Sequence, residues 1–267
     1  MNLIEREMSS ILKTCKENFG VLAVKAEFEA EGTRMDELLR LVEIAHSAQL
    51  DLTVKIGGCE AIRDLYESKQ IGVQYIVAPM VETPYAATKF SLAKSLVFDE
   101  IERSDTEFLI NIETKTAVEN FSEILSVATQ PNSFDGFVFG RVDYIGSLGL
   151  ERKEVDSQHV LEQILALSER IKSANKTLVV GGGVSADSVS FLREIQTSHL
   201  SRFETRKIVF DGESIQHAEI SRALLLAVKF ELLWLKNKQS YYGRIHHEDD
   251  KRIDMLEKRW QVLDKNI

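Results

Sequence analysis

Residues 108–143 read FLINIETKTAVENFSEILSVATQPNSFDGFVFGRVD, and this stretch decides the fold. It begins with one short apolar run, Phe108–Glu113, and ends with another, Gly136–Asp143. Neither run alternates strictly between apolar and polar residues, which is typical of strands buried on both faces of a parallel sheet. The segment between them is long enough for a helix, so the stretch predicts a strand–helix–strand unit.

The same unit repeats from residue 20 to residue 211. Seven apolar runs alternate with amphipathic segments, at Val21–Phe28, Leu52–Gly57, Tyr75–Met80, Phe108–Glu113, Gly136–Asp143, Thr177–Gly181 and Lys207–Asp211. The segments between them have helical periodicity, as in the stripe of Val160, Ile164 and Leu167. Thr83 followed by Pro84, Asp156 and Ser185 are expected to begin helices.

Seven such units fit either an open doubly wound sheet or a closed barrel. No G-x-G-x-x-G turn follows the first run, and such a turn would favour the open sheet. Charged residues gather where the runs end, at Glu27, Lys55, Glu82, Glu113 and Asp143. Because active sites of (β/α) barrels are drawn from the ends of many strands, we predict a TIM-type barrel.

An eighth strand is not apparent in the sequence. Residues 4–18 have the pattern of a helix, so we expect the barrel to be irregular or to lack its usual first strand. We assign residues 1–215 to a barrel catalytic domain. Residues 216–267 are assigned to a C-terminal helical extension that closes the barrel and contacts other subunits.

The C-terminal extension carries more apolar residues than one closing helix needs. A first apolar helix is expected to run through Leu224, Val228 and Trp234, and a second from Asp249 to Leu263. Contiguous exposed apolar surface usually marks an interface. We therefore expect a homo-oligomer, based on a dimer or a trimer, with residues from about 236 onward at the contact. The alternative is a monomer in which the tail folds back on its own barrel.

The net charge of −9 argues against nucleic acid as a partner, because a phosphate backbone requires a basic surface. No apolar run is long enough to cross a membrane, and the N-terminus has no signal-peptide pattern. The two cysteines form neither a metal-ligand spacing nor a disulfide framework. These features predict a cytoplasmic protein that acts on a small molecule.

Three segments resemble one known family. They are residues 76–83 (IVAPMVET), 108–120 (FLINIETKTAVEN) and 134–149 (FDGFVFGRVDYIGSLG). Their order and spacing are similar to those of the HpcH/HpaI aldolase and citrate lyase β-subunit family, within the phosphoenolpyruvate/pyruvate barrel superfamily. The resemblance extends over about residues 20 to 211.

The resemblance implies a divalent metal site at Glu113 and Asp143. In that family a Glu and an Asp at the ends of successive strands hold the cation, which in turn holds the keto acid. Two carboxylates with substrate oxygens and waters suit Mg²⁺ or Mn²⁺. Such a cation would stabilise the enolate formed when a carbon–carbon bond breaks. The alternative is that Glu113 caps the following helix and Asp143 caps a turn.

Two positions depart from the family pattern near the expected catalytic groups. Lys55 stands where the family usually has an arginine that holds the substrate. A lysine supplies the positive charge but not the bidentate geometry of arginine. Alternatively, the Lys55 amine could form a Schiff base with the substrate. Glu27 matches the family's acid, but Phe28 replaces the histidine that transfers protons. No other histidine follows a strand. The base would then be Glu27, Glu29, a metal-bound water or Lys55.

Other residues are assigned to the site with alternatives left open. Arg141, close to Asp143, is expected to reach substrate or to pair with an acid such as Asp135 or Glu113. Gly182 and Gly183, followed by Ser185, form a glycine-rich turn into a helix that suits an anion, although a tight turn explains it equally well. Glu82, at a strand end, is expected to contact substrate. Arg202 and Arg206 flank the last run and would add positive charge.

Together these features predict a divalent-metal-dependent carbon–carbon lyase or aldolase that acts on a 2-oxo acid through a metal-stabilised enolate. One alternative is a citrate-lyase-like enzyme that uses a coenzyme A thioester, although no adenine-binding signature is present. The other is a catalytically altered barrel that binds an anionic metabolite or a partner without turnover.

Overall fold

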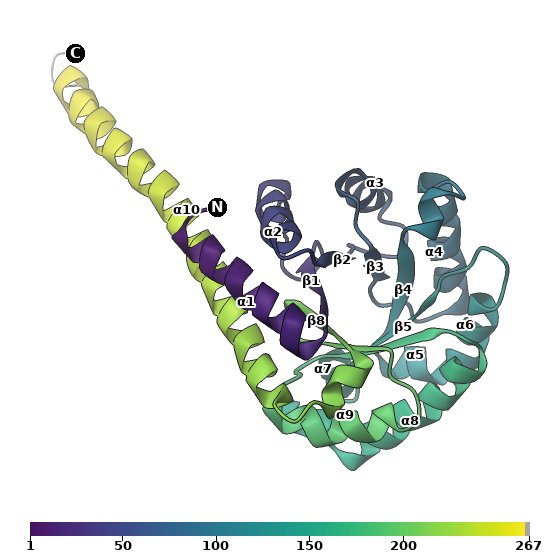
Figure 1. Cartoon of the computed structure of the whole chain (residues 1–267). Coiled ribbons are helices and arrows are strands. Elements are labelled where there is room, and N and C mark those ends of the chain that lie inside the picture. The colour runs from purple at the N-terminus through teal and green to yellow at the C-terminus, as the bar shows by residue number, and fades with distance from the viewer. Residues whose placement is uncertain (265–267) are drawn as a thin grey trace.

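The chain folds into a closed eight-stranded barrel surrounded by helices, as a computed structural model of residues 1–264 shows (Figure 1). The strands pair in sequence order around the barrel. They are β1 (Val21–Glu27), β2 (Asp51–Lys55), β3 (Tyr75–Ala78), β4 (Glu107–Ile112), β5 (Gly136–Gly140), β6 (Thr177–Gly181), β7 (Arg202–Glu204) and β8 (Ile208–Asp211). The predicted TIM-type barrel is therefore confirmed.

Helices follow the strands on the outside of the barrel. They are α1 (Leu3–Phe19), α2 (Met35–Ser47), α3 (Ile62–Ile71), α4 (Pro84–Val97), α5 (Lys115–Glu119), α6 (Phe121–Ala128), α7 (Arg141–Ser147), α8 (Gln158–Ser173), α9 (Val189–Gln196) and α10 (Ile220–Asp264). Thr83 caps α4 as expected, since its hydroxyl accepts the amide of Ala86 at 3.1 Å. Asp156 does not cap α8, whose N-cap is Ser157.

The strand that the sequence did not reveal is β7, near the end of the barrel. It is only three residues long and contains Arg202 and Glu204, so no apolar run marks it. The first strand is present and pairs with both β2 and β8. The barrel is irregular for another reason: β8 runs antiparallel to β7 and to β1. We expected the run at residues 207–211 to be a parallel strand, and that expectation is wrong.

Because β8 is reversed, the residues that precede it lie at the carboxyl ends of the parallel strands instead of their amino ends. Arg206 and Lys207 precede β8 in a tight turn after β7, so they lie at the carboxyl end of the parallel strands. Arg202, at the start of β7, lies at the opposite end and pairs with Glu107 at the start of β4. Of the two arginines that flank the last run, only Arg206 lies near the predicted site.

The fifth predicted strand ends earlier than its apolar run. Strand β5 stops at Gly140, and Arg141–Ser147 is helix α7. Asp143 therefore lies in the first turn of a helix rather than at the end of a strand. The valine-containing sequence GFVFGRVD does not distinguish a continuing strand from a short buried helix turn.

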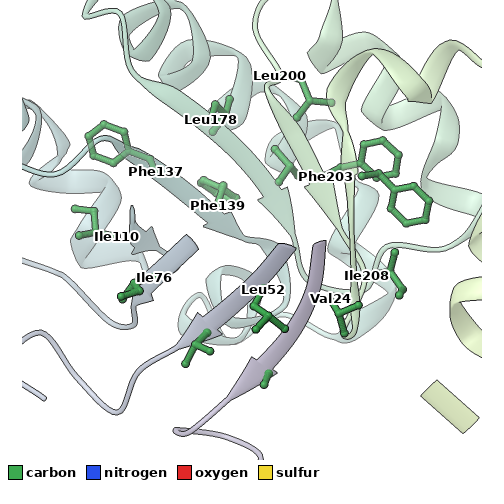
Figure 2. Packing of buried hydrophobic residues seen from close by; sticks show 14 of the residues in the cluster. Val24, Leu52, Ile76, Ile110, Phe137, Phe139, Leu178, Leu200, Phe203 and Ile208 are labelled. Atoms are coloured by element: carbon green, nitrogen blue, oxygen red, sulfur yellow. The ribbon is translucent and has the colours of Figure 1, made fainter. Parts of the chain in front are cut away.

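The outward faces of the strands form the main hydrophobic core. Val24, Leu52, Ile110, Phe139 and Leu178 all point away from the barrel axis toward the surrounding helices (Figure 2). Because successive side chains alternate between the two faces of a strand, their neighbours point into the barrel. The outer face therefore holds the fold together, and the inner face is available for a site.

The inner face is apolar only in its middle. Val77, Leu109, Val138 and Val179 form a separate buried cluster there. Beneath it, the guanidinium of Arg202 donates to both oxygens of Glu107 at 2.7 and 2.8 Å. Above it, toward the carboxyl ends of the parallel strands, the interior side chains are charged and border a cavity.

Helix α10 leaves the barrel and runs past α1 (Figure 1). Its first part is anchored by Ala227, Phe230 and Trp234, which belong to the main core. Asn237 joins it to α1 by donating to Glu5 at 3.2 Å. The two predicted tail helices are one continuous helix, and the division into domains at residue 215 stays a prediction. Within residues 1–264, no helix has the length and hydropathy of a membrane span.

Candidate active site

A cavity of about 390 Å³ opens at the carboxyl ends of the parallel strands. This volume is typical of small-molecule sites. Its acidic lining residues are Glu27, Glu29, Glu113, Asp143, Glu204 and Glu231, and its basic ones are Lys25, Lys55, Arg152 and Arg206. Six acids against four bases leave a formal surplus of two negative charges. The cavity therefore suits a cation together with an acidic ligand better than an anion alone.

Lys25 lies between two carboxylates at one side of the cavity. Its ammonium forms an ion pair with Glu204 and lies 3.3 Å from Glu27. Burial alone would lower the pKa of Lys25, but the two carboxylates outweigh it and raise that pKa above its usual value. Burial would raise the pKa of Glu27, yet Lys25 and Lys55 hold the pKa of that carboxyl below its usual value. Both groups are therefore charged at neutral pH.

Glu113 is buried on the other side of the cavity, just after β4, with three donors around it. One oxygen accepts the amide of Met80 at 2.9 Å. The other accepts from the side-chain amide of Asn111 and lies 3.4 Å from the ammonium of Lys55. Met80 has a φ of 51°, a left-handed conformation that a side chain disfavours. Such strain tends to occur at functional sites.

Two glycines make room for this arrangement. A Cβ at Gly140 would lie 2.7 Å from Glu113 Oε2, so any side chain would displace the carboxylate. A Cβ at Gly181 would lie 3.0 Å from a side-chain oxygen of Glu204. Both positions end strands, and the absence of a side chain at each lets the neighbouring carboxylate turn inward.

Asp143, Gly182 and Gly183 line the same cavity as Glu113. Both glycines have positive φ values, 80° and 71°. A Cβ at Gly182 would lie 2.7 Å from the backbone amide of Val142, so the turn packs tightly against the first turn of α7. The structure thus brings together Glu27, Lys55, Glu113 and Asp143 with the glycine turn, as the sequence predicted.

Arg141 is not brought to the cavity. Its side chain is fully buried, forms an ion pair with Asp156, donates to the carbonyl of Gly181 at 3.1 Å and lies over the ring of Phe191. Burial lowers the pKa of Arg141, and the Asp156 carboxylate opposes that shift. The catalytic role predicted for Arg141 does not fit this position, because α7 begins at residue 141 and turns the side chain outward. Its partner is Asp156 rather than Asp135 or Glu113.

Glu82 and Ser185 also lie outside the cavity lining. The carboxylate of Glu82 accepts the hydroxyl of Thr114 at 2.6 Å, which joins the loop after β3 to the start of α5. The hydroxyl of Ser185 accepts the amide of Asp187 at 3.2 Å and caps the helical turn that leads into α9. Both residues are therefore occupied in local structure, and the predicted substrate contacts do not fit them.

Several polar residues of the cavity were not predicted from the sequence, above all Lys25, Asn111 and Glu204. Two of them, Lys25 and Asn111, could have been found from their spacing in the sequence. Lys25 precedes Glu27 by two residues and Asn111 precedes Glu113 by two, so each pair shares the inner face of one strand. Asn111 Oδ1 is buried without a hydrogen-bond partner among the described residues, which points to a ligand there.

The donor set fits a divalent cation that keeps part of its water shell. Within residues 1–264, no group of three or more His, Cys, Asp or Glu side chains is arranged as a complete metal cage. Two carboxylates, Glu113 and Asp143, line the cavity, and Mg²⁺ is commonly bound by one or two carboxylates with waters and substrate. The surplus of two negative charges and the unpartnered oxygen of Asn111 agree with such an ion.

A charged cavity at the carboxyl ends of the strands lies where the active sites of (β/α)-barrel enzymes are found. The model of the HpcH/HpaI aldolase/citrate lyase family matches residues 33–213, so the chain belongs to that family. A search of curated proteins found no match.

Several solved structures have the same fold as this chain. The chain resembles an HpcH/HpaI aldolase from Desulfitobacterium hafniense DCB-2 with a TM-score of 0.60 and 17% identity, over 77% of this chain and 84% of that one. It resembles an HpcH/HpaI aldolase/citrate lyase family protein from Burkholderia cenocepacia J2315 with a TM-score of 0.59 and 13% identity, over 84% and 90%. A variant of the citrate synthase SbnG gives a TM-score of 0.53 and 14% identity, over 83% and 89%.

Proposed function

We propose that the protein is a divalent-metal-dependent carbon–carbon lyase or aldolase that acts on a 2-oxo acid. The observation that carries this proposal is the cavity, in which acidic side chains outnumber basic ones by two and Glu113 and Asp143 lie among them. A divalent cation balances that surplus and leaves the lysines to meet a carboxylate substrate. The volume of about 390 Å³ suits a small keto acid.

Glu113 and Asp143 are the residues that would hold Mg²⁺ or Mn²⁺. The bound cation supplies Lewis-acid stabilisation of the developing enolate oxygen. Asn111 and the amide of Met80 orient the Glu113 carboxylate, because both donate to it. Gly182 and Gly183 line the cavity near Asp143, where their turn packs against the first turn of α7.

Lys55 is the residue that would meet the acid or carbonyl oxygen of the substrate. Its ammonium lies 3.4 Å from both Glu29 and Glu113, inside the cavity and almost fully buried. A charge at this point attracts the substrate anion and stabilises negative charge that develops during bond cleavage.

Proton transfer is assigned to Glu29. The family's histidine is absent, and Phe28 at that position packs against the hydrophobic core. Glu27 is a weak base because Lys25 and Lys55 keep its pKa below the usual value. Glu29 lines the same cavity with a more open side chain, and its pairing with Lys55 keeps it beside the substrate position.

Two other functions remain as alternatives. In the first, the enzyme is citrate-lyase-like and takes a coenzyme A thioester, with the exposed Arg152 at the cavity available to an anionic part of the cofactor. In the second, the barrel binds an anionic metabolite without turnover. The contacts of Glu113 with Met80, Asn111 and Lys55 favour this second alternative, because they take up three of the roughly four acceptor positions of the carboxylate.

We also propose that the protein acts as a homo-oligomer. Exposed apolar residues on the distal part of α10, including Ile253, Leu256 and Trp260, support a subunit contact from about residue 236 onward.

The test of the proposed activity is exchange of the C3 protons of pyruvate in D₂O, followed by NMR. The expected result is exchange that requires Mg²⁺ or Mn²⁺, stops with a chelator and is lost in Glu29→Gln. Metal-independent exchange would contradict the role of the cation. Pyruvate binding without exchange would favour the binding protein, and exchange only with an acyl-coenzyme A would favour the thioester enzyme.

A further inference from the structure

Helix α10 carries a regular stripe of residues that are at least partly exposed. Starting at Leu225, every residue at alternating steps of three and four is at least partly exposed as far as Trp260. The apolar members are 47–67% exposed and are Leu225, Val228, Leu232 and Leu235, followed after a polar interval by Ile253, Leu256 and Trp260. The polar interval consists of Gln239, Tyr242, His246 and Asp249. The two apolar runs share one 3–4 register across the polar interval, and apolar residues at this spacing form the heptad pattern of a coiled-coil seam.

The distal half of α10 has little support from its own chain. Beyond Tyr242, whose hydroxyl donates to Glu37 at 2.6 Å, the helix projects past α1 and away from the barrel (Figure 1). Residues 243–260 are exposed without exception. A helix gains most of its stability from packing an apolar face, and a single unsupported helix in water is marginal. Packing of the stripe against a second helix would therefore stabilise the distal half of α10.

The order of residues along the stripe specifies how the partner runs. If a second α10 lies antiparallel and the two cross at Arg244, Val228 meets Trp260, Leu232 meets Leu256, and Leu235 meets Ile253. In the polar interval, Gln239 meets Asp249, and Tyr242 meets His246. Every apolar residue of these five pairs is matched with an apolar one and every residue of the polar interval with another of that interval.

A parallel pairing is less favourable with the same residues. It would place Asp249 of one helix against Asp249 of the other, and like charges within a seam are destabilising. A parallel pairing would also place the barrels of both subunits at the same end of the two-helix coiled coil. The antiparallel arrangement places the barrels at opposite ends and lets the distal, unsupported half of each α10 cover the exposed Leu225–Leu235 segment of the other.

We propose that two copies of this chain form a homodimer through an antiparallel coiled coil of their α10 helices. The seam comprises residues 225–260 and its two-fold axis passes near Arg244. A contact of this kind is isologous, because each helix supplies the same surface to the other. The proposal rests on the proposed homo-oligomer but not on the reaction or the metal site, so a monomeric protein would leave the proposed activity untouched.

The first test is the mass of the full-length protein by light scattering at micromolar concentration. The expected mass is twice that of the 30.3 kDa chain. Leu232→Asp and Leu256→Asp should each weaken dimerisation at least about 100-fold, because a carboxylate would be buried against an apolar partner. Met255→Asp is the matched control, since Met255 is 58% exposed on the same helix but lies off the seam, and it should remain a dimer.

Three outcomes of this test would overturn the proposal. They are a wild-type mass of 30.3 kDa, an assembly that both seam variants leave intact, and dissociation by Met255→Asp as complete as that by Leu232→Asp. All of the substituted side chains are exposed in the single chain, so the barrel should fold in each variant, and circular dichroism checks this.

The second test determines the direction of the helices. In a Cys59→Ser background, Val228→Cys protein mixed with Trp260→Cys protein should form a disulfide-linked dimer, and Trp260→Cys alone should not. Cross-linking of Trp260→Cys alone would indicate parallel helices. A protein carrying both cysteines that cross-links within one chain would indicate that the tail folds back at Gly243. Either result contradicts the antiparallel dimer.

Discussion

The two ends of the barrel interior are both charged, yet they are built differently. At the amino ends of the parallel strands, Arg202 makes two hydrogen bonds to Glu107 and lies 4.4 Å from the centre of the Tyr75 ring. Tyr75 in turn donates to Asp51 at 3.1 Å. At the carboxyl ends, carboxylates outnumber cations, and the oxygen of Asn111 has no partner in the described part of the chain.

The difference supports the proposal that the lower polar layer is structural and the upper one functional. At the lower end, Arg202 and Glu107 form a bidentate pair and Asp51 accepts from Tyr75, so these groups already have partners. At the upper end, excess negative charge and an unsatisfied buried oxygen leave the site incomplete without a ligand. Substitutions at the two ends should therefore have different consequences.

The largest expected effect on stability belongs to the lower end. Arg202→Met leaves Glu107 without its cation inside the barrel, which should reduce the free energy of unfolding by about 3 kcal/mol. Urea denaturation measures the change. The matched control is Arg63→Met, which removes an exposed ion pair with Glu67 and should cost no more than about 0.5 kcal/mol. Weaker Mn²⁺ binding in Arg202→Met would contradict the separation of the two ends.

Lys55→Met should show the largest effect on activity at the upper end. Loss of the charge that meets the substrate oxygen should slow pyruvate proton exchange by about 100- to 1,000-fold. Lys89→Met, which removes an ion pair with Glu60 outside the cavity, should leave the rate unchanged. If borohydride with pyruvate traps a covalent adduct on the wild-type protein, Lys55 forms a Schiff base and the metal–enolate mechanism is wrong.

The metal ligands should show a smaller change, measured as affinity. Glu113→Gln and Asp143→Asn should each weaken Mn²⁺ binding by about 100-fold in titration calorimetry, because each replaces a charged ligand with a neutral amide. Glu151→Gln, an exposed acid that pairs with Lys153, should bind Mn²⁺ as the wild type does. Unchanged affinity in both ligand variants would end the assignment of the metal site.

The smallest effect should be a pH dependence of stability at Glu27. Its pKa in the folded protein lies below the ordinary value of 4.5, so its ionised form stabilises the fold above that pH. This contribution is lost as the pH falls through the folded pKa. The difference in unfolding free energy between wild type and Glu27→Gln should therefore shrink as the pH is lowered from neutral to below 4.5.

The sequence by itself determined the architecture of the barrel and half of the candidate site. Buried parallel strands and amphipathic helices differ in composition and period, so six parallel strands and the helices between them could be predicted from local pattern. Glu27, Lys55, Glu113 and Asp143 could be brought to one end because the carboxyl ends of parallel strands share one edge of a barrel.

Only the tertiary structure decided the rest of the site. The pair of Lys25 and Glu204 joins residues 179 positions apart, and β7 is too short and too polar to form a recognisable run. The reversal of β8 depends on its pairing with both β1 and β7, and the local sequence pattern does not predict that pairing. Arg141 turned out to be structural because α7 starts one residue after Gly140 and directs the side chain to Asp156. Local sequence specifies period and propensity, whereas the partner of a buried charge is chosen by the packing of the whole chain.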